Sequence, residues 1–355
     1  MVGATGIEPV TPSVSGRCSP AELHARATAA APLLSRPRHR PQAPPATFPR
    51  DTRPRPGFNG AMDMQVPAAG LDPAPPLRLA CPVQQTAPLV FVSPHSGRDY
   101  PADFVAAARL DALGLRRSED CFVDDLFAEA PGHGAPLLAA TFPRAFCDAN
   151  REPWELDPAM FQDALPSWVN SASPRVGAGL GTIARVVASG EAIYRDKLAF
   201  AEAERRVRGC WQPFHAALEA LIEQTRADFG GCLLIDCHSM PAHGCAGRNG
   251  SVPIDIVLGD AHGTACAARI TRRVEQVFIG LGYTVRRNDP YAGGYITRHY
   301  GRPREGVHAL QIEVARRLYM DETRIERGAG FATVRRDLTS LIGAIAAEAG
   351  ALLTG

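Results

Sequence analysis

The sequence contains almost no lysine: Lys197 is the single one, and arginine supplies the rest of the 38 basic residues. Acidic residues number 37, so the formal net charge of +1 gives no broad attraction to nucleic acid or to a membrane surface. No basic patch with interleaved aromatic residues occurs either, which argues against a nucleic-acid-binding module. Most of the arginines are therefore expected at the solvated surface.

Membrane and disulfide signals are missing as well. No stretch approaches ~18 uninterrupted apolar residues, the length that a membrane span needs, and no basic region followed by an apolar one marks a secretory signal. The nine cysteines form an odd set without a C-x-x-C pair, which favours reduced thiols. We therefore expect a cytoplasmic protein without a membrane partner; the sequence gives no indication of oligomeric state.

Residues 1–75 differ from the rest of the chain. They are rich in Pro, Ala, Arg and Ser and lack a periodic apolar pattern. Because such a composition cannot offset the entropy cost of ordering, we expect a disordered extension there and a single folded domain over 76–355. The opening, from Gly3 to Leu23, resembles a peptide translated through a transfer-RNA gene, so we expect the biological chain to begin at Met62 or Met64.

From about residue 86, short apolar runs alternate with helical patterns. We expect strands at 88–93, 136–140, 145–148, 232–237, 253–258, 283–287 and 307–314. Apolar stripes at helical spacing within 207–221, 266–281 and 331–345 predict three amphipathic helices. This order predicts an α/β fold, a three-layer α/β/α sandwich around a central mixed sheet. The unpatterned segment 150–190 is long enough to predict a lid or binding loop.

Two His-Ser pairs lie at the ends of strand-like runs. His95 follows the run 88–93, and His238 closes the run 232–237. These imidazoles can converge at one edge of the sheet, where open α/β sheets bind ligands. Neutral imidazole is a common zinc ligand, and a catalytic zinc uses three protein ligands and one open position. One histidine alone is usually structural, but the pair predicts a metal-dependent hydrolase.

A carboxylate is expected as the third ligand. Asp120 and Asp124 are four residues apart in a predicted helix that Ser118 would cap, so both should lie on one helix face. The plain alternative is that acidic residues in a first helical turn only stabilise the helix dipole.

Glu313 is the next candidate for a role in chemistry, because its charged side chain interrupts an apolar strand. Alternation puts Gln311 and Glu313 on the face opposite to the apolar residues of this strand. A buried carboxylate needs a partner, which here would be a water molecule at the metal or, alternatively, Arg316 or Arg317.

Arginine is the residue suited to an acidic substrate, because it holds a carboxylate bidentately. Arg144 and the pair Asn150-Arg151 follow the strands expected near 136–148. The glycine-rich segment 291–297 is flanked by tyrosines and fits neither a Walker loop nor a dinucleotide fingerprint. It is expected to form a flexible loop.

Taken in order, these segments resemble the N-formylglutamate amidohydrolase family over about residues 86–350. The segments that carry the resemblance are Pro94-His95-Ser96-Gly97, 120–126, 144–151, Asp236-Cys237-His238-Ser239-Met240-Pro241, 288–297, 309–314 and Leu318-Tyr319-Met320. The resemblance implies hydrolysis of N-formyl-L-glutamate, a small acidic N-acyl amino acid, to formate and glutamate. It also implies one zinc ion per active site and a link to histidine degradation.

The family is distantly similar to zinc carboxypeptidases, which implies a zinc-exopeptidase-like fold and specific roles. His95 and His238 become metal ligands. Because no glutamate stands three residues after His95, the third ligand must come from elsewhere, and Asp120 is favoured over Asp124 and Asp99. Glu313 becomes the general base. Residues implied in substrate binding are Arg144, Asn150, Arg151, Arg248 and Tyr295. An amidase for another N-acyl amino acid and a catalytically silent binding protein remain open alternatives.

Overall fold

The computed structural model describes residues 75–242 and 253–354, all within a compact unit that spans Asn59–Gly355. The predicted N-terminal extension and Arg248 lie outside the described residues. A seven-stranded sheet, ordered β1-β3-β2-β4-β7-β5-β6, forms the centre. Its strands are β1 (Leu77–Ala80), β2 (Leu89–Ser93), β3 (Leu137–Ala140), β4 (Cys232–Met240), β5 (Ile256–Gly259), β6 (Val285–Arg287) and β7 (Val307–Ala315).

The sheet is mixed, as predicted. Strands β3, β2, β4 and β7 run parallel, β1 is antiparallel to β3, and β5 is antiparallel to β7 but parallel to β6. The carboxyl ends of the four central parallel strands therefore meet at one edge of the sheet. In the register of β4 and β7, His238 lies opposite Glu313, so two candidate site residues stand side by side at that edge.

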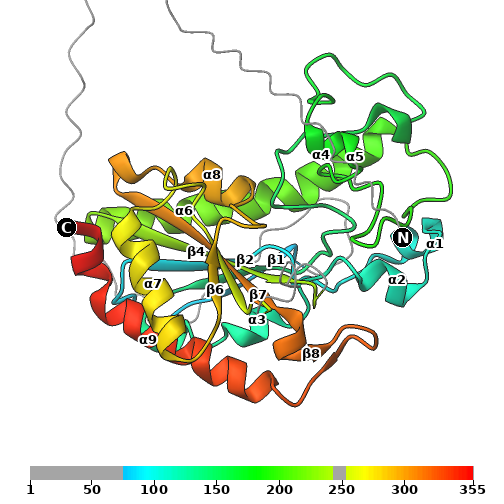
Figure 1. The fold of residues 1–355 in the computed structure, drawn as a ribbon. Coiled ribbons are helices and arrows are strands. Elements are labelled where there is room, and N and C mark those ends of the chain that lie inside the picture. Colours follow the sequence, from blue (N-terminus) through cyan, green and yellow to red (C-terminus); the bar gives the residue numbers. More distant parts are fainter. Residues whose placement is uncertain (1–74, 243–252, 355) are drawn as a thin grey trace, which may run out of the picture. The chain divides into compact units, whose positions relative to one another are not determined.

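Helices cover both faces of the sheet (Figure 1). Each central strand divides its side chains between two cores: in β2, Val90 and Val92 face one, and Leu89 and Phe91 the other. Both sets are fully buried, which is typical of parallel strands packed on two sides. The predicted three-layer α/β/α fold is therefore confirmed. The main covering helices are α6 (Gln212–Phe229), α7 (Ala268–Gly280), α8 (Tyr295–Tyr300) and α9 (Phe331–Thr354).

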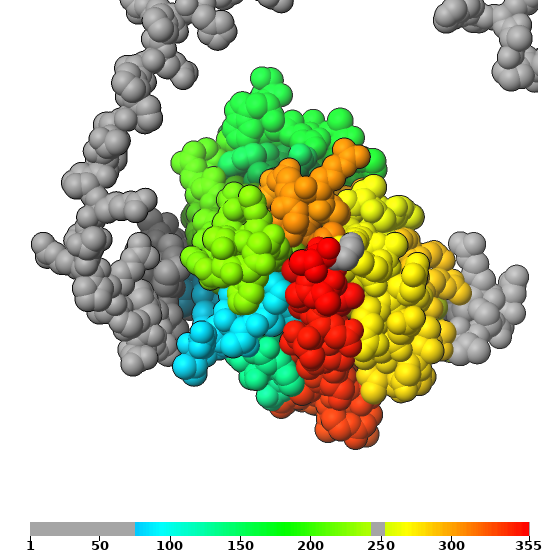
Figure 2. All heavy atoms as spheres, turned by 90° about the vertical axis from the view of Figure 1, so that its left-hand side faces the viewer, coloured from blue at the N-terminus to red at the C-terminus, as the bar shows by residue number. Residues whose placement is uncertain are grey.

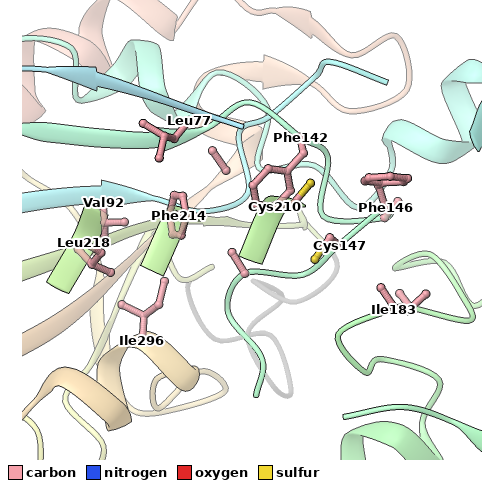
Figure 3. Packing of buried hydrophobic residues seen from close by; sticks show 14 of the residues in the cluster. Leu77, Val92, Phe142, Phe146, Cys147, Ile183, Cys210, Phe214, Leu218 and Ile296 are labelled. Atoms are coloured by element: carbon pink, nitrogen blue, oxygen red, sulfur yellow. The ribbon is translucent and has the colours of Figure 1, made fainter. Parts of the chain in front are cut away.

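The first core lies between the sheet and α6 and α8. Phe214 and Leu218 of α6 and Ile296 of α8 pack against Val92, and Phe142 and Phe146 extend this core toward the segment after β3 (Figure 3). The residues of the predicted stripe 207–221 contribute to this face, but Val207–Trp211 form a π-helix, η3, before α6 begins. The stripe is thus helical throughout, with a widened first turn.

The second core lies beneath α7 and α9, which contact each other along the opposite face. Figure 2 shows α9 at the surface beside α7. Among the described helices, α9 is the single one long and apolar enough to cross a membrane by length and composition. Its buried stripe, which includes Leu338, Leu341 and Ile345, belongs to this core. We therefore interpret α9 as a core helix, as its predicted stripe indicated.

The strand expected at 145–148 is absent, and this prediction was wrong. Residues 144–146 form a turn in which the amides of Phe146 and Cys147 donate to the carbonyl of Pro143, at 2.9 and 3.2 Å. The apolar residues of this run are buried in the first core. Burial without a neighbouring strand therefore produced the apolar pattern that was interpreted as a strand.

The long segment 150–198 contains short elements and isolated bridges rather than regular structure. It is drawn in green in Figure 1, and both views place it on the side of α6 and α8, away from α7 and α9. The remaining elements are α1 (Ala102–Ala107), α2 (Ala112–Arg116), α3 (Val123–Leu126), η1 (Pro131–His133), η2 (Pro158–Met160), α4 (Pro174–Gly177), α5 (Phe200–Arg206), η6 (Pro303–Glu305), η7 (Arg316–Leu318), β8 (Met320–Asp321) and β9 (Glu326–Arg327).

Candidate active site

The two predicted histidines meet at the carboxyl edge of the sheet. His95 lies two residues after β2, and His238 lies within β4, the parallel neighbour of β2. Their ring centroids are 4.9 Å apart, and both side chains are buried. Adjacent parallel strands therefore bring together two residues that are far apart in the sequence.

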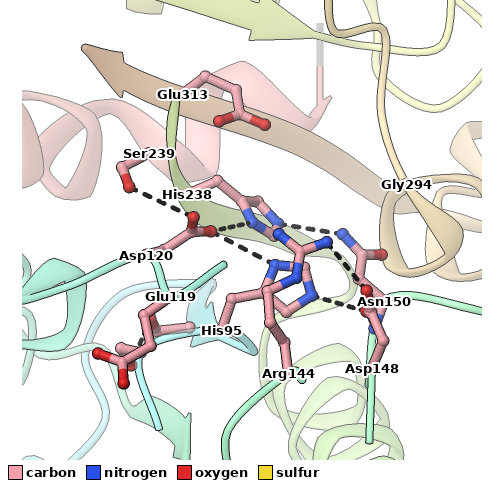
Figure 4. Close-up of polar contacts among 12 residues, drawn as sticks. His95, Glu119, Asp120, Arg144, Asp148, Asn150, His238, Ser239, Gly294 and Glu313 are labelled. Atoms are coloured by element: carbon pink, nitrogen blue, oxygen red, sulfur yellow. Dashed lines mark hydrogen bonds and ion pairs between the residues drawn. The ribbon is translucent and has the colours of Figure 1, made fainter. Parts of the chain in front are cut away.

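Asp120 completes this arrangement (Figure 4). Its Oδ2 atom lies 2.9 Å from Nδ1 of His238 and 3.3 Å from Nδ1 of His95. The backbone amide of Asp120 donates to the carbonyl of His95 at 3.0 Å, which holds the two segments together. One ligand atom from each residue lies within 4.8 Å of the others, so these side chains, called here the histidine cluster, could hold a metal ion.

Asp120 reaches this position from a turn and not from a helix, so the predicted shared helix face was wrong. Phe122 adopts the left-handed conformation at φ 65°, which separates Asp120 from α3. Ser118 is not the helix cap either, since its Oγ accepts the amide of Ala188 at 3.0 Å. A left-handed phenylalanine is uncommon, and helical spacing does not predict it.

The two other carboxylates considered as third ligands point elsewhere. Asp124 is buried but forms ion pairs with Arg78 and with Arg98, the latter at 3.3 Å. Asp99 is exposed. Of the three carboxylates, Asp120 is therefore the one that faces the histidines.

Each histidine ring is also held from its other nitrogen. Nε2 of His95 lies 2.7 Å from Asp148, and Nε2 of His238 lies 2.8 Å from Asp236. Metal-binding histidines commonly donate this second N–H to a carboxylate, which fixes the ring and leaves the other nitrogen for the metal. Sequence reasoning missed both carboxylates, although Asp236 lies two residues before His238 on the same strand.

The donor atoms fit a divalent cation. Nδ1 of His95 is buried and forms no hydrogen bond within the described residues, so it is an orphaned ligand atom directed at Asp120. Burial opposes ionisation of Asp120, but the hydrogen bond from His238 and the proximity of His95 outweigh it and hold the pKa of Asp120 well below its usual value. Two imidazole nitrogens and an ionised carboxylate oxygen are ligands that zinc accepts.

Arg316 and Ser239 orient the Asp120 carboxylate. Its Oδ1 atom lies 3.0 Å from Nη2 of Arg316 and 3.3 Å from Oγ of Ser239, and Arg316 also donates to Ser239 at 3.1 Å. This leaves Oδ2 for the histidines. Arg316 was considered a partner of Glu313, as was Arg317, but Arg317 pairs with Asp255. Neither arginine pairs with Glu313.

Glu313 projects from β7 on the predicted face and is 7% exposed. Its Oε1 accepts a hydrogen bond from Gln311 at 2.8 Å, and Gln311 in turn accepts the amide of Gly294 at 2.9 Å. Burial raises the pKa of Glu313 to about 7, against the opposing effect of His238 and with a further rise from Asp120. A carboxyl group with a pKa near neutrality can both accept and release a proton.

A cavity of about 460 Å³ opens above these residues. It is lined by the histidine cluster, Glu313 and Asn150, together with the three neighbouring arginines Arg144, Arg151 and Arg175, called here the arginine group. Nη2 of Arg144 pairs with Asp148 at 2.9 Å, and Nη2 of Arg151 lies 3.8 Å from the same carboxylate. Three of the five predicted substrate-binding residues thus line the cavity.

Asn150 is already engaged within the protein. Its Oδ1 accepts the amide of Ile296 at 2.8 Å, and its Nδ2 lies 3.1 Å from Nε2 of His238. The structure therefore places Asn150 as a support between β4 and α8 at the floor of the cavity.

Tyr295 is not among the residues that line the cavity, and its contact with substrate stays a prediction. Its ring stacks on His299 with centroids 4.7 Å apart and packs beside Trp211. As the first residue of α8, it points toward the π-helix η3. The preceding Gly293 and Gly294 line the cavity instead, together with Arg298.

Comparison with known proteins shows the family to which the chain is similar. The family model for N-formylglutamate amidohydrolase matches residues 87–320. An N-formylglutamate deformylase of Pseudomonas putida is 30% identical over 239 residues, and one of Pseudomonas aeruginosa is 32% identical over 240; each match covers 66% of this chain and 83% of the relative.

A solved structure also matches this chain. The N-formylglutamate amidohydrolase of Ralstonia eutropha is 40% identical to this chain, with a TM-score of 0.73, and the match covers 77% of this chain and 98% of that one. The matched family region contains the histidine cluster, the arginine group and Glu313. This chain therefore belongs to the N-formylglutamate amidohydrolase family.

Proposed function

We propose that this chain hydrolyses the formyl amide of N-formyl-L-glutamate and releases formate and L-glutamate. The observation that carries this proposal is the placement of the histidine cluster beside Glu313 in a cavity that the arginine group also lines. The histidine cluster and Glu313 are suited to amide hydrolysis, and the arginine group is suited to binding an acidic substrate. Relatives of the chain named N-formylglutamate deformylase support the same substrate.

We propose zinc as the metal, held by Nδ1 of His95, Nδ1 of His238 and Oδ2 of Asp120. When bound, zinc supplies a Lewis acid and lowers the pKa of a coordinated water from about 15.7 toward 7. Asp148 and Asp236 keep both imidazoles in the required orientation and tautomer. Arg316 and Ser239 keep the Asp120 carboxylate turned so that one oxygen remains available.

Glu313 is proposed as the general base. It accepts the proton of the attacking water and then delivers it to the amide nitrogen as the C–N bond breaks, so that glutamate leaves with a neutral amine. Its raised pKa suits both steps. The bond from Gln311 holds one carboxylate oxygen, so the other is directed to the reacting atoms.

Arg144 and Arg151 are proposed to bind the α-carboxylate of the substrate. Asp148 joins them to His95, since it contacts both arginines and the imidazole. A carboxylate bound there lies close to the histidine cluster, as the α-carboxylate must when the amide on the same Cα atom is cleaved. Arg151 is fixed by bonds from Nε to the carbonyl of Leu180 at 2.9 Å and from Nη1 to that of Asn150 at 2.8 Å.

The test is direct. Purified chain loaded with zinc is given N-formyl-, N-acetyl- and N-succinyl-L-glutamate, and formate release and free amine are measured. We expect the formyl compound to be the best substrate. Preferred cleavage of another acyl group would replace N-formylglutamate as the substrate, and absence of cleavage in a zinc-loaded protein would overturn the proposal.

The cellular setting is proposed on chemical grounds and by family resemblance. All seven cysteines in the described part of the chain are free thiols, six of them buried, which supports a reducing compartment such as the cytoplasm. From the family resemblance, we propose that the reaction serves histidine degradation. Growth of a deletion strain on histidine would test this role, since an unimpaired strain would contradict it.

A further inference from the structure

The charges that line the cavity are not balanced. Its lining contains five arginines and three carboxylates, and each of the three has a partner on the protein. Asp120 pairs with Arg316, Asp148 pairs with Arg144 and Arg151, and Glu313 accepts from Gln311. The two other lining arginines, Arg175 and Arg298, form no ion pair with any described residue. The cavity therefore holds positive charge that the described protein does not neutralise.

Arg175 is linked to Arg151 through the backbone of Leu180. Its backbone carbonyl accepts the amide of Leu180 at 2.8 Å, and the carbonyl of Leu180 accepts Nε of Arg151 at 2.9 Å. Burial, together with the like charges of Arg144 and Arg175, lowers the pKa of Arg151 to about 10. The positive charge of Arg175 thus acts on Arg151, and Arg175 itself forms no ion pair with a described carboxylate.

Arg298 is placed differently. It lies on α8, it is exposed, and its Nε donates to the carbonyl of Gly293 at 3.1 Å. Contacts from His95 through Asp148, Arg151 and Leu180 lead to Arg175, whose side chain is half-buried, whereas Arg298 is exposed. Arg175 is therefore the unpaired cation that continues the line along which the substrate would bind.

The substrate has a charge at the matching end. In an N-formyl amino acid, the carbon of the α-carboxylate lies three bonds from the formyl carbon, whereas the side-chain carboxylate carbon of glutamate lies five bonds away. The α-carboxylate is assigned above to the arginines nearest to His95. A second carboxylate must therefore meet a cation farther from the histidine cluster, and such a group is favoured where positive charge is uncompensated.

We propose that Arg175 binds the side-chain carboxylate of the substrate and so selects dicarboxylic N-formyl amino acids over neutral ones. This assignment rests on the proposed function, because it presumes that the amide is cleaved at the histidine cluster. Arginine suits the role, since its planar fork can hold a carboxylate through two parallel hydrogen bonds. Short helix α4, capped by Ser173, fixes the backbone of Arg175 within the long segment 150–198.

The experiment compares N-formyl-L-glutamate with N-formyl-L-glutamine, which has nearly the same shape without the charge. Arg175→Gln should lower kcat/KM for the glutamate compound by about 10- to 100-fold, mainly through KM, since a charged hydrogen bond is lost. The value for the glutamine compound should stay unchanged. Arg195→Gln is the matched control, because Arg195 lies exposed in the same segment and does not line the cavity.

Each result has a distinct meaning. An unchanged preference for the glutamate compound in Arg175→Gln overturns the assignment, as does an equal loss with both compounds. A loss of preference in Arg298→Gln but not in Arg175→Gln also overturns it. Failure of the unaltered protein to cleave either compound refutes the proposed function, and the Arg175 proposal with it, so the two failures are separable.

Discussion

The histidine cluster and the arginine group line the same cavity, but they differ in how their charges are paired within the protein. In the histidine cluster, both Nε2 atoms face carboxylates, and Arg316 pairs with Asp120. In the arginine group, Asp148 is shared by two guanidinium groups, and Arg175 has no ion pair with a described residue. A satisfied polar network stays fixed, whereas uncompensated charge attracts a ligand of opposite sign.

This difference separates bond cleavage from substrate selection. The histidine cluster is built on β2, β4 and the turn at Asp120, so its geometry follows from the sheet. Much of the arginine group belongs to the irregular segment 150–198. Substitutions in the histidine cluster should therefore change metal affinity or kcat, and those in the arginine group should change KM. The following predictions test that separation.

The largest effect is expected for Glu313→Gln. The variant keeps the shape of the side chain but removes the proton acceptor, so kcat should fall by about 10²- to 10⁴-fold. Zinc content, measured by elemental analysis, should remain that of the unaltered protein because Glu313 is not one of the proposed ligands. Glu305→Gln, at an exposed position just before β7, is the control. Near-normal turnover in Glu313→Gln would remove its role as general base.

A smaller effect is expected for Asp236→Asn. Asp236 holds Nε2 of His238 and also accepts a hydrogen bond from Thr297 at 3.0 Å, so the change loosens the ring without deleting a ligand. Zinc affinity, measured by competition with a chromogenic chelator, should weaken by about 10- to 100-fold. Arg151→Ala should leave zinc affinity unchanged in the same assay. Equal losses in both variants would contradict the separation of the two regions.

Arg151→Ala should act on substrate binding. Removing its guanidinium takes away a charged donor to the α-carboxylate, so KM for N-formyl-L-glutamate should rise by roughly 10- to 100-fold, with a smaller change in kcat. Steady-state kinetics at saturating zinc would measure both constants. An unchanged KM would transfer the binding role to Arg144, which shares Asp148 with Arg151.

The sequence predicted the sheet side of the site better than the loop side, and the reason is physical. Apolar runs mark the central strands, side chains along a strand alternate between its two faces, and the carboxyl ends of parallel neighbours meet, so His95, His238 and Glu313 could be placed from pattern alone. Asp120 was selected correctly as the carboxylate that faces them, but through a helix that begins only at Val123. Its position depends on the left-handed Phe122, which no periodicity encodes.

The arginine group was predicted only in part. Arg144 and Arg151 were singled out because arginine holds carboxylates well, and both line the cavity. Arg175 was not recognised, since nothing local distinguishes it from the many other arginines. Its proposed role follows from the lack of an ion pair with a described carboxylate. Only the three-dimensional arrangement shows which arginines are paired and which are not. The side-chain direction of Tyr295 was not predicted for a similar reason, because the sequence did not show that α8 begins at this residue.

The smallest predicted effect concerns His215, which supports the turn joining the two regions. Its Nε2 lies 2.8 Å from the carbonyl of Ala149, and its Nδ1 lies 2.9 Å from the hydroxyl of Tyr300. Burial lowers the pKa of His215 to about 4, despite the hydrogen bond to Ala149, so the folded protein keeps this ring neutral. In the unfolded chain, a histidine has a pKa of about 6.5.

Between these two pKa values the unfolded chain binds one more proton than the folded chain at His215, so stability must decrease as the pH falls through this range. We expect the free energy of unfolding of the unaltered protein to drop by about 1 to 2 kcal/mol more than that of His215→Gln between pH 6.5 and pH 5. Chemical denaturation at several pH values measures both. Parallel curves would mean that His215 becomes protonated without unfolding, and that the turn carrying Asp148 and Arg151 does not depend on a neutral ring beneath it.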